Sequence, residues 1–342
     1  MHTFQMLRAQ TPDDAVRLAA AGTDTAPRPI RFLAGGTTLV DLMKLDVEQP
    51  QQVIDINRLP FDQVEQTADG GLKIGALVRN SDLANHPLVM QRYPVLSQAL
   101  LSGASAQLRN MATTGGNLLQ RTRCVYFRDI ATAACNKRQP GSGCAAMEGF
   151  HRNLAILGIS DQCIATNPSD MNVALTALEA TIHVQGAGGA RMIPINDFYL
   201  LPGATPQRET VLAPGELVTH VSLAAPVANA RSTYLKLRDR ASYEFALSSA
   251  AVLIGVSGGR ISHARVALGG VGTRPWRSPE AEAVLQGAAP NVDTFARAAA
   301  SSVRDARTHR DNAFKVDLIQ RCLVQALKIA LSSAPSPAQR SA

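Results

Sequence analysis

The segment from residue 32 to residue 39 reads Phe32-Leu33-Ala34-Gly35-Gly36-Thr37-Thr38-Leu39. The apolar run from Ile30 to Ala34 predicts a buried strand, and Leu39 to Leu45 predicts a helix. Paired glycines let a ligand approach the backbone closely, and the N–H groups at a helix start attract anions such as phosphate. The segment matches neither a Walker A loop nor GxGxxG. It therefore fits either a phosphate-binding loop or a tight turn between strand and helix.

A second segment, Ala112-Thr113-Thr114-Gly115-Gly116-Asn117-Leu118, again combines hydroxyl residues with adjacent glycines. The Asn117 amide adds a group that can orient the polar edge of a ligand. Two such loops in one region of mixed helices and strands favour a shared diphosphate site. Two unrelated turns are the alternative.

Around these loops the chain divides into an N-terminal and a C-terminal region. Residues 1–60 predict a small βαβ-like unit, and residues 61–225 mix strands and helices in a second subdomain. A linker at 226–230 leads to strand-like runs and then helices, which predict an antiparallel sheet with helices over residues 228–331. The fold class is therefore α+β. The Ser/Pro/Ala-rich residues 332–342 are expected to form a disordered tail.

Four of the five cysteines, Cys124, Cys135, Cys144 and Cys163, lie in the irregular stretch 121–168. Their spacing is not that of a zinc ribbon, but four thiolates on an irregular loop can hold an iron–sulfur cluster. Nearby arginines and lysines are expected to lower the thiol pKa values and offset the charge of a cluster. Structural zinc, buried free thiols and two disulfides are the alternatives. Cys322 lies in an apolar helical pattern and is expected to be a core thiol.

Composition excludes several classes of protein. The hydrophobic fraction of 46% is that of a globular chain, and the net charge of +7 is not gathered into a basic block, so we expect no nucleic-acid binding. No apolar run is long enough to span a membrane. The first six residues do not look like a secretory signal, so we expect folding in the cytoplasm unless a partner exports the chain. HExxH does not occur and the scattered histidines form no convincing catalytic triad, so nothing supports hydrolysis.

Taken together, these segments resemble the FAD-binding medium subunit of the molybdenum hydroxylases, the family of xanthine dehydrogenase, carbon monoxide dehydrogenase and aldehyde oxidoreductases. The resemblance spans nearly the whole chain. It rests on Ala34-Gly35-Gly36-Thr37, Ile54-Asp55-Ile56, Ile74-Gly75-Ala76, the stretch from Arg109 to Leu118, Ser169-Asp170, Pro214-Gly215-Glu216-Leu217 and the stretch from Leu268 to Arg277.

The resemblance departs from most of the family at residues 121–168, which separate the second loop from Ser169-Asp170. This insertion, with its four cysteines, is similar to that of the FAD subunit of three-subunit periplasmic aldehyde oxidoreductases, which carries a [4Fe–4S] cluster. The resemblance therefore implies that Cys124, Cys135, Cys144 and Cys163 bind a [4Fe–4S] cluster.

The implied fold is a two-subdomain FAD-binding domain of the PCMH (vanillyl-alcohol-oxidase-like) type over residues 1–225, followed by the C-terminal sheet-and-helix domain. The implied FAD-binding residues are Phe32, Leu33, Ala34, Gly35, Gly36, Thr37, Thr38, Leu39, Gly103, Thr113, Thr114, Gly115, Gly116, Asn117, Asp170, Val218 and Lys236. No catalytic residue is expected, because the cofactor supplies the chemistry. Relatives control access to the flavin at residues 197–203, where Tyr199 or an apolar neighbour is expected to cover the ring and hinder NAD.

The implied function is an electron-transfer subunit of a heterotrimeric molybdenum-dependent aldehyde oxidoreductase. A small subunit with [2Fe–2S] centres would supply electrons, and a large subunit would hold the molybdenum cofactor. The external acceptor would be ferredoxin, a quinone, a cytochrome or oxygen. Alternatives are the FAD subunit of a xanthine or N-heterocycle dehydrogenase, and a non-redox scaffold with structural zinc. The periplasm, reached by co-export with a partner, is the expected location, and the cytoplasm is the alternative.

Overall fold

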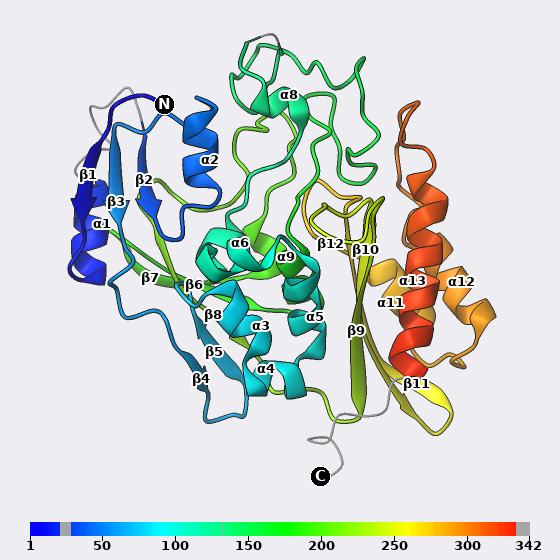
Figure 1. Cartoon of the computed structure of the whole chain (residues 1–342). Coiled ribbons are helices and arrows are strands. Elements are labelled where there is room, and N and C mark those ends of the chain that lie inside the picture. The colour runs from blue at the N-terminus through cyan, green and yellow to red at the C-terminus, as the bar shows by residue number, and fades with distance from the viewer. Residues whose placement is uncertain (21–28, 132, 333–342) are drawn as a thin grey trace.

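The computed structural model describes residues 1–20, 29–131 and 133–332. Three sheets lie side by side across the molecule, with the segment 121–168 above them in Figure 1. The expected disordered tail lies outside the described residues, apart from Ser332, which ends the last helix. None of the helices in the described part of the chain combines the length and apolar character needed to cross a bilayer.

The N-terminal unit is a parallel three-stranded sheet in the order β1-β3-β2 with two short helices. Its strand β2 leads directly into the first glycine loop (residues 34–38), and α2 follows that loop. The unit consists of β1 (Gln5–Arg8), α1 (Pro12–Ala20), β2 (Ile30–Leu33), α2 (Leu39–Lys44) and β3 (Gln52–Asp55). The β-helix-β pattern expected from the sequence is therefore present.

The second part has an antiparallel five-stranded sheet in the order β4-β5-β8-β6-β7. Its strands are β4 (Val64–Gln66), β5 (Leu72–Gly75), β6 (Thr181–Gly186), β7 (Gly189–Pro194) and β8 (Leu217–Leu223). Its helices are α3 (Asn80–Asn85), α4 (Pro87–Arg92), α5 (Pro94–Ser102), α6 (Ala106–Met111), α7 (Thr114–Leu118), α9 (Asp170–Ala177) and α10 (Ile195–Phe198).

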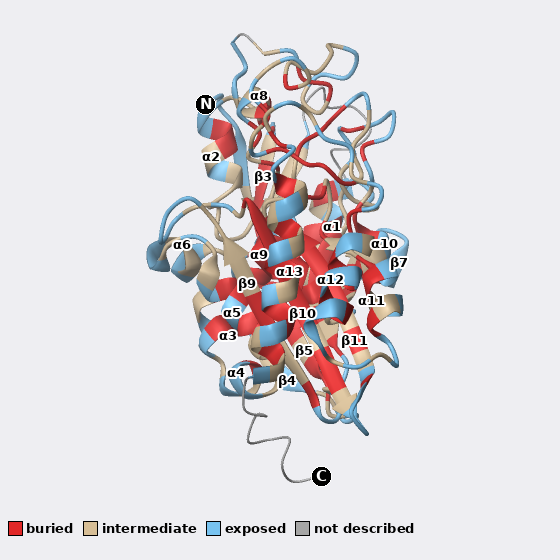
Figure 2. Cartoon of the chain, turned by 90° about the vertical axis from the view of Figure 1, so that its right-hand side faces the viewer, coloured by how far each residue is buried: buried red, intermediate tan, exposed pale blue. Residues whose placement is uncertain are grey.

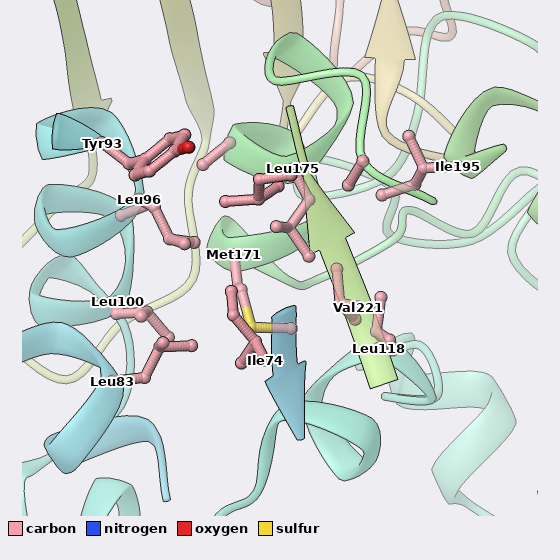
Figure 3. Close-up of a cluster of buried hydrophobic side chains, with 14 of the residues drawn as sticks. Ile74, Leu83, Tyr93, Leu96, Leu100, Leu118, Met171, Leu175, Ile195 and Val221 are labelled. Atoms are coloured by element: carbon pink, nitrogen blue, oxygen red, sulfur yellow. The ribbon is translucent and has the colours of Figure 1, made fainter. Parts of the chain in front are cut away.

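The core of this part forms between the sheet and the helices α3, α5 and α9. Ile74 and Val221 of the sheet lie in one buried cluster with Leu96 of α5 and Met171 of α9, as Figure 3 shows. Helix α9 has every residue buried, including the polar residues Asp170, Asn172 and Thr176, whose side chains form hydrogen bonds inside the protein.

The segment 121–168 forms one short helix, α8 (Val125–Arg128), and is otherwise irregular in its described residues. It is anchored to the N-terminal unit because Arg123 and Arg128 both pair with Asp41 of α2. The irregular stretch expected from the sequence is therefore ordered by its contacts.

The C-terminal part is an antiparallel sheet in the order β12-β11-β10-β9 with three helices packed on one face (Figure 2). Alternate residues of β10 face opposite sides: Ala250 and Val252 pack against α12 and α13, whereas Ala251 belongs to the core around α5 and α9. The elements are β9 (Ala230–Leu237), β10 (Ser248–Ser257), β11 (Arg260–Gly269), β12 (Trp276–Arg277), α11 (Pro279–Leu285), α12 (Val292–Ser301) and α13 (Lys315–Ser332).

Candidate functional site

A cleft of about 1030 Å³ opens between the N-terminal unit and the second part of the chain. Of the residues predicted to bind FAD, the cleft is lined by Phe32, Ala34, Gly35, Gly36, Thr37, Thr38, Leu39, Thr113, Gly115, Gly116 and Val218. The segment 199–218 forms much of the opposite wall, and residues of the insertion close one end. The volume is that of a pocket for a large organic ligand.

The first glycine loop offers a set of unused hydrogen-bond donors to this cleft. The backbone amides of Gly35, Gly36, Thr37 and Thr38 make no hydrogen bond to another described residue. Gly36 has a φ of +73°, which glycine adopts readily. A Cβ atom at Gly35 would lie 1.8 Å from the carbonyl oxygen of Met111, so the two loops pack backbone to backbone. Free amides at a tight turn before a helix suit an anionic diphosphate.

The second glycine loop (residues 112–117) resembles the first in sequence, but several of its backbone amides form hydrogen bonds within the protein. Thr113 caps α7 by accepting a hydrogen bond from the Gly116 amide at 3.2 Å. The amides of Thr114 and Gly115 donate to the carbonyls of Val78 and Ala76. The amides of Thr114, Gly115 and Gly116 are therefore engaged within the protein. Its contribution to the cleft is a side-chain-free surface at Gly115 and Gly116.

Three other predicted FAD-binding residues lie behind the walls of the cleft and do not line it. Leu33 is half-buried in β2, and the Thr114 hydroxyl donates to the Val78 carbonyl. Asn117 is buried and accepts a 2.7 Å hydrogen bond from the Ser169 hydroxyl. Thr114 and Asn117 therefore support the second glycine loop through hydrogen bonds within the protein.

Gly103, Asp170 and Lys236 also lie outside the cleft lining, and they form a buried cluster of their own. The Lys236 ammonium donates to Asp170 Oδ2 at 2.9 Å and to the Ser102 carbonyl at 3.0 Å. Tyr234 donates to Asp170 Oδ1 at 2.5 Å. A Cβ atom at Gly103 would lie 3.1 Å from Asp170 Oδ2. Tyr234 and Lys236, which alternate along β9, are therefore both buried partners of Asp170.

The four clustered cysteines all line a second, small pocket inside the insertion. Cys124, Cys135 and Cys163 are buried and Cys144 is half-buried, and all four are free thiols. The structure therefore does not support the alternative in which these four cysteines form two disulfides. Within the described residues, no three Cys, His, Asp or Glu side chains are arranged to hold a single metal ion.

The expectation that cationic neighbours lower the thiol pKa values is wrong for Cys124, Cys144 and Cys163. Burial raises the pKa of Cys124 to about 11, and it also raises the pKa values of Cys144 and Cys163. The arginines of the insertion are directed elsewhere: Arg138, for example, donates to the carbonyls of Tyr126 and Phe127. Lys137 is the cation whose charge opposes the rise at Cys163.

Sequence reasoning missed a chain of ion pairs along the cleft. Arg121 pairs with both Glu48 and Glu209, and the Lys137 ammonium lies 2.9 Å from Glu209 Oε1. The charges of Arg121 and Lys137 hold the pKa of Glu209 below its usual value despite burial. These contacts join the N-terminal unit, the insertion and the wall at 199–218. Partners so distant in sequence leave no local pattern that could have revealed them.

Comparison with known proteins places this geometry in a family. Residues 2–226 match the FAD binding domain in molybdopterin dehydrogenase, and residues 232–330 match the CO dehydrogenase flavoprotein C-terminal domain. The chain is 49% identical to the aldehyde oxidoreductase FAD-binding subunit PaoB of Escherichia coli, over 98% of this chain and 100% of that protein. It is 28% identical to the glyceraldehyde dehydrogenase medium chain of Sulfolobus acidocaldarius, over 95% and 97%.

Solved structures agree with this assignment. The carbon monoxide dehydrogenase of Hydrogenophaga pseudoflava contains a chain that superimposes with a TM-score of 0.75 at 25% identity, covering 97% of this chain and 98% of that one. The chain therefore belongs to the FAD-binding medium subunits of the molybdenum hydroxylase family, and it is an oxidoreductase subunit that binds FAD. The α+β fold expected from the sequence is confirmed.

Proposed function

We propose that this chain is the FAD- and [4Fe–4S]-containing electron-transfer subunit of a heterotrimeric molybdenum-dependent aldehyde oxidoreductase. The observation that carries the proposal is the cleft with four backbone amides that have no partner among the described residues, next to a pocket lined by four free cysteines. The full-length identity of 49% with a subunit named for aldehyde oxidation favours this function over the xanthine or N-heterocycle alternative.

In this proposal the first glycine loop binds the diphosphate of FAD through the amides of Gly35 to Thr38. Gly115 and Gly116 leave room for the cofactor, and Val218 and Tyr199 provide apolar contacts on the far wall. Bound FAD supplies reversible two-electron chemistry to an external acceptor. The protein contributes orientation, shielding from water and electrostatics.

The four cysteines would bind the cluster as thiolates. A buried thiol with a raised pKa binds metal only by releasing its proton, and the bound metal then provides the compensating charge. The cluster would also join the two ends of the insertion, because Cys124 and Cys163 lie close to its limits.

The test is metal and flavin analysis of the anaerobically purified complex, with single Cys→Ser substitutions. We expect FAD, iron and acid-labile sulfide in the parent protein, and loss of iron in the Cys124, Cys135, Cys144 and Cys163 variants. Cys322→Ser is the matched control: this thiol is a buried residue of α13 and lies outside the pocket, so its variant should keep its iron. Zinc in place of iron would support the scaffold alternative, and unchanged iron in all four variants would exclude the cluster.

The proposal also includes a small [2Fe–2S] subunit, a large molybdenum-cofactor subunit and a periplasmic location reached by co-export. Co-purification of three chains with a tagged copy of this one tests the assembly. Fractionation of cells with and without the partner's export signal tests the location, and a complex found only in the cytoplasm would exclude it.

A further inference from the structure

The cleft and the cysteine pocket share part of one wall. Lys137, Cys163 and Ala165 line both of them. Cys163 is therefore at once one of the four cysteines and a residue of the flavin cleft. The two spaces are therefore adjacent at these three residues.

Lys137 places a positive charge in this shared layer. Its side chain is 8% exposed, and its ammonium is held by Glu209 Oε1 at 2.9 Å and by the Pro206 carbonyl at 2.8 Å. The same charge acts on the sulfur of Cys163. Glu209, which also lines the cleft, adds a negative charge beside it.

We propose that Lys137 and Glu209 form a charge pair that sets the reduction potentials of both the flavin and the cluster. This inference rests on the proposed function, because it requires both groups to be bound. Lys137 and Glu209 act as positioning residues: neither is assigned a proton or an electron.

The expected direction follows from electrostatics. Reduction makes each centre more negative, so a nearby ammonium favours the reduced form and raises the potential, whereas a nearby carboxylate lowers it. The effect is larger for a poorly solvated pair than for surface charges, which are screened by water and salt. Each member of the pair therefore moves both centres in the same direction, and the two members oppose each other.

The experiment is a redox titration of the holo complex, following the flavin by absorbance and the cluster by electron paramagnetic resonance. Lys137→Met should lower both midpoint potentials, and Glu209→Gln should raise both. The double variant should lie near the parent, and Lys137→Arg should also stay near it because it keeps the charge. Lys73→Met, which removes a lysine from β5 outside both pockets, is the control and should shift neither potential.

Three results would overturn the inference: unchanged potentials in both single variants, a shift confined to one centre, or shifts of the same sign in both variants. If Lys137→Met fails to retain its cluster, the midpoint potentials of Glu209→Gln still test the inference, because both are expected to rise. Absence of iron or flavin from the parent complex would instead contradict the proposed function, so the two failures are distinguishable.

Discussion

The ammonium of Lys236 lies 2.9 Å from a carboxylate oxygen of Asp170 in the protein interior, which joins β9 of the C-terminal sheet to the first turn of α9. The two side chains are only 3% and 8% exposed. Lys236→Met should therefore leave a buried carboxylate with Tyr234 as its remaining side-chain partner. We expect a loss of about 3 kcal/mol in the free energy of unfolding, measured by urea denaturation.

Breaking an exposed pair provides the comparison for this value. Lys73 lies 4.0 Å from Glu65, and both side chains are largely solvated. Lys73→Met should cost less than about 1 kcal/mol. Equal losses in the two variants would show that the buried pair has no special role.

Replacement of Gly116 should prevent flavin binding without unfolding the chain. A Cβ atom there would meet only the Thr113 hydroxyl, at 3.0 Å, and a larger side chain would project into the cleft. We expect Gly116→Val to lose FAD on gel filtration, judged by the ratio of flavin to protein absorbance. Gly188→Val, at a position with open space around it, should retain the cofactor. Full flavin occupancy in Gly116→Val would refute the placement.

Lys315 should make stability depend on pH. Its buried ammonium donates to the carbonyls of Leu154 and Gly270, and burial lowers its pKa to about 7. Between that value and the ordinary value of 10.5 the unfolded chain binds more protons, so the free energy of unfolding should rise with pH. From pH 7 to pH 9 the rise attributable to Lys315 is at most about 2 kcal/mol.

Lys315→Met isolates this contribution. The variant should be less stable, because two carbonyls lose their donor, and the difference from the parent should widen as the pH increases. Parallel stability curves for the two proteins would contradict the assigned pKa.

Tyr199 should restrict access to the cleft. The side chain is buried, its hydroxyl donates to the Leu118 carbonyl at 2.9 Å, and the residue lines the cleft beside Leu200. We expect NADH to reduce the flavin of the parent protein slowly and that of Tyr199→Ala faster, measured by stopped-flow absorbance. Tyr199→Phe keeps the ring and should resemble the parent. Rapid reduction of the parent by NADH would argue against the role.

Local sequence patterns located most of the fold. The apolar run before Gly35 became β2, and the segment after Thr38 became α2. Strands such as β7 were missed because nearly all of its residues are exposed, so it has no apolar alternation.

The site was predictable only where its residues adjoin in sequence. The two glycine loops were found because each is a continuous motif, but their different use of backbone amides depends on Val78 and Ala76, which no motif connects to the second loop. The pairing of Lys137 with Glu209 likewise depends on the tertiary fold, because the two residues are far apart in sequence. The clustering of the cysteines was visible in the sequence, whereas the burial that raises the pKa of Cys124 was not.

The anchoring of the insertion has a consequence for the order of events during biosynthesis. Its arginines pair with Asp41, Lys137 pairs with Glu209, and the Leu154 carbonyl receives its hydrogen bond from Lys315. These partners come from the beginning, the middle and the end of the chain. We therefore expect the segment that holds the cysteines to reach its final conformation only after Lys315 has been synthesised and has left the ribosome, and the proposed cluster would then be inserted late.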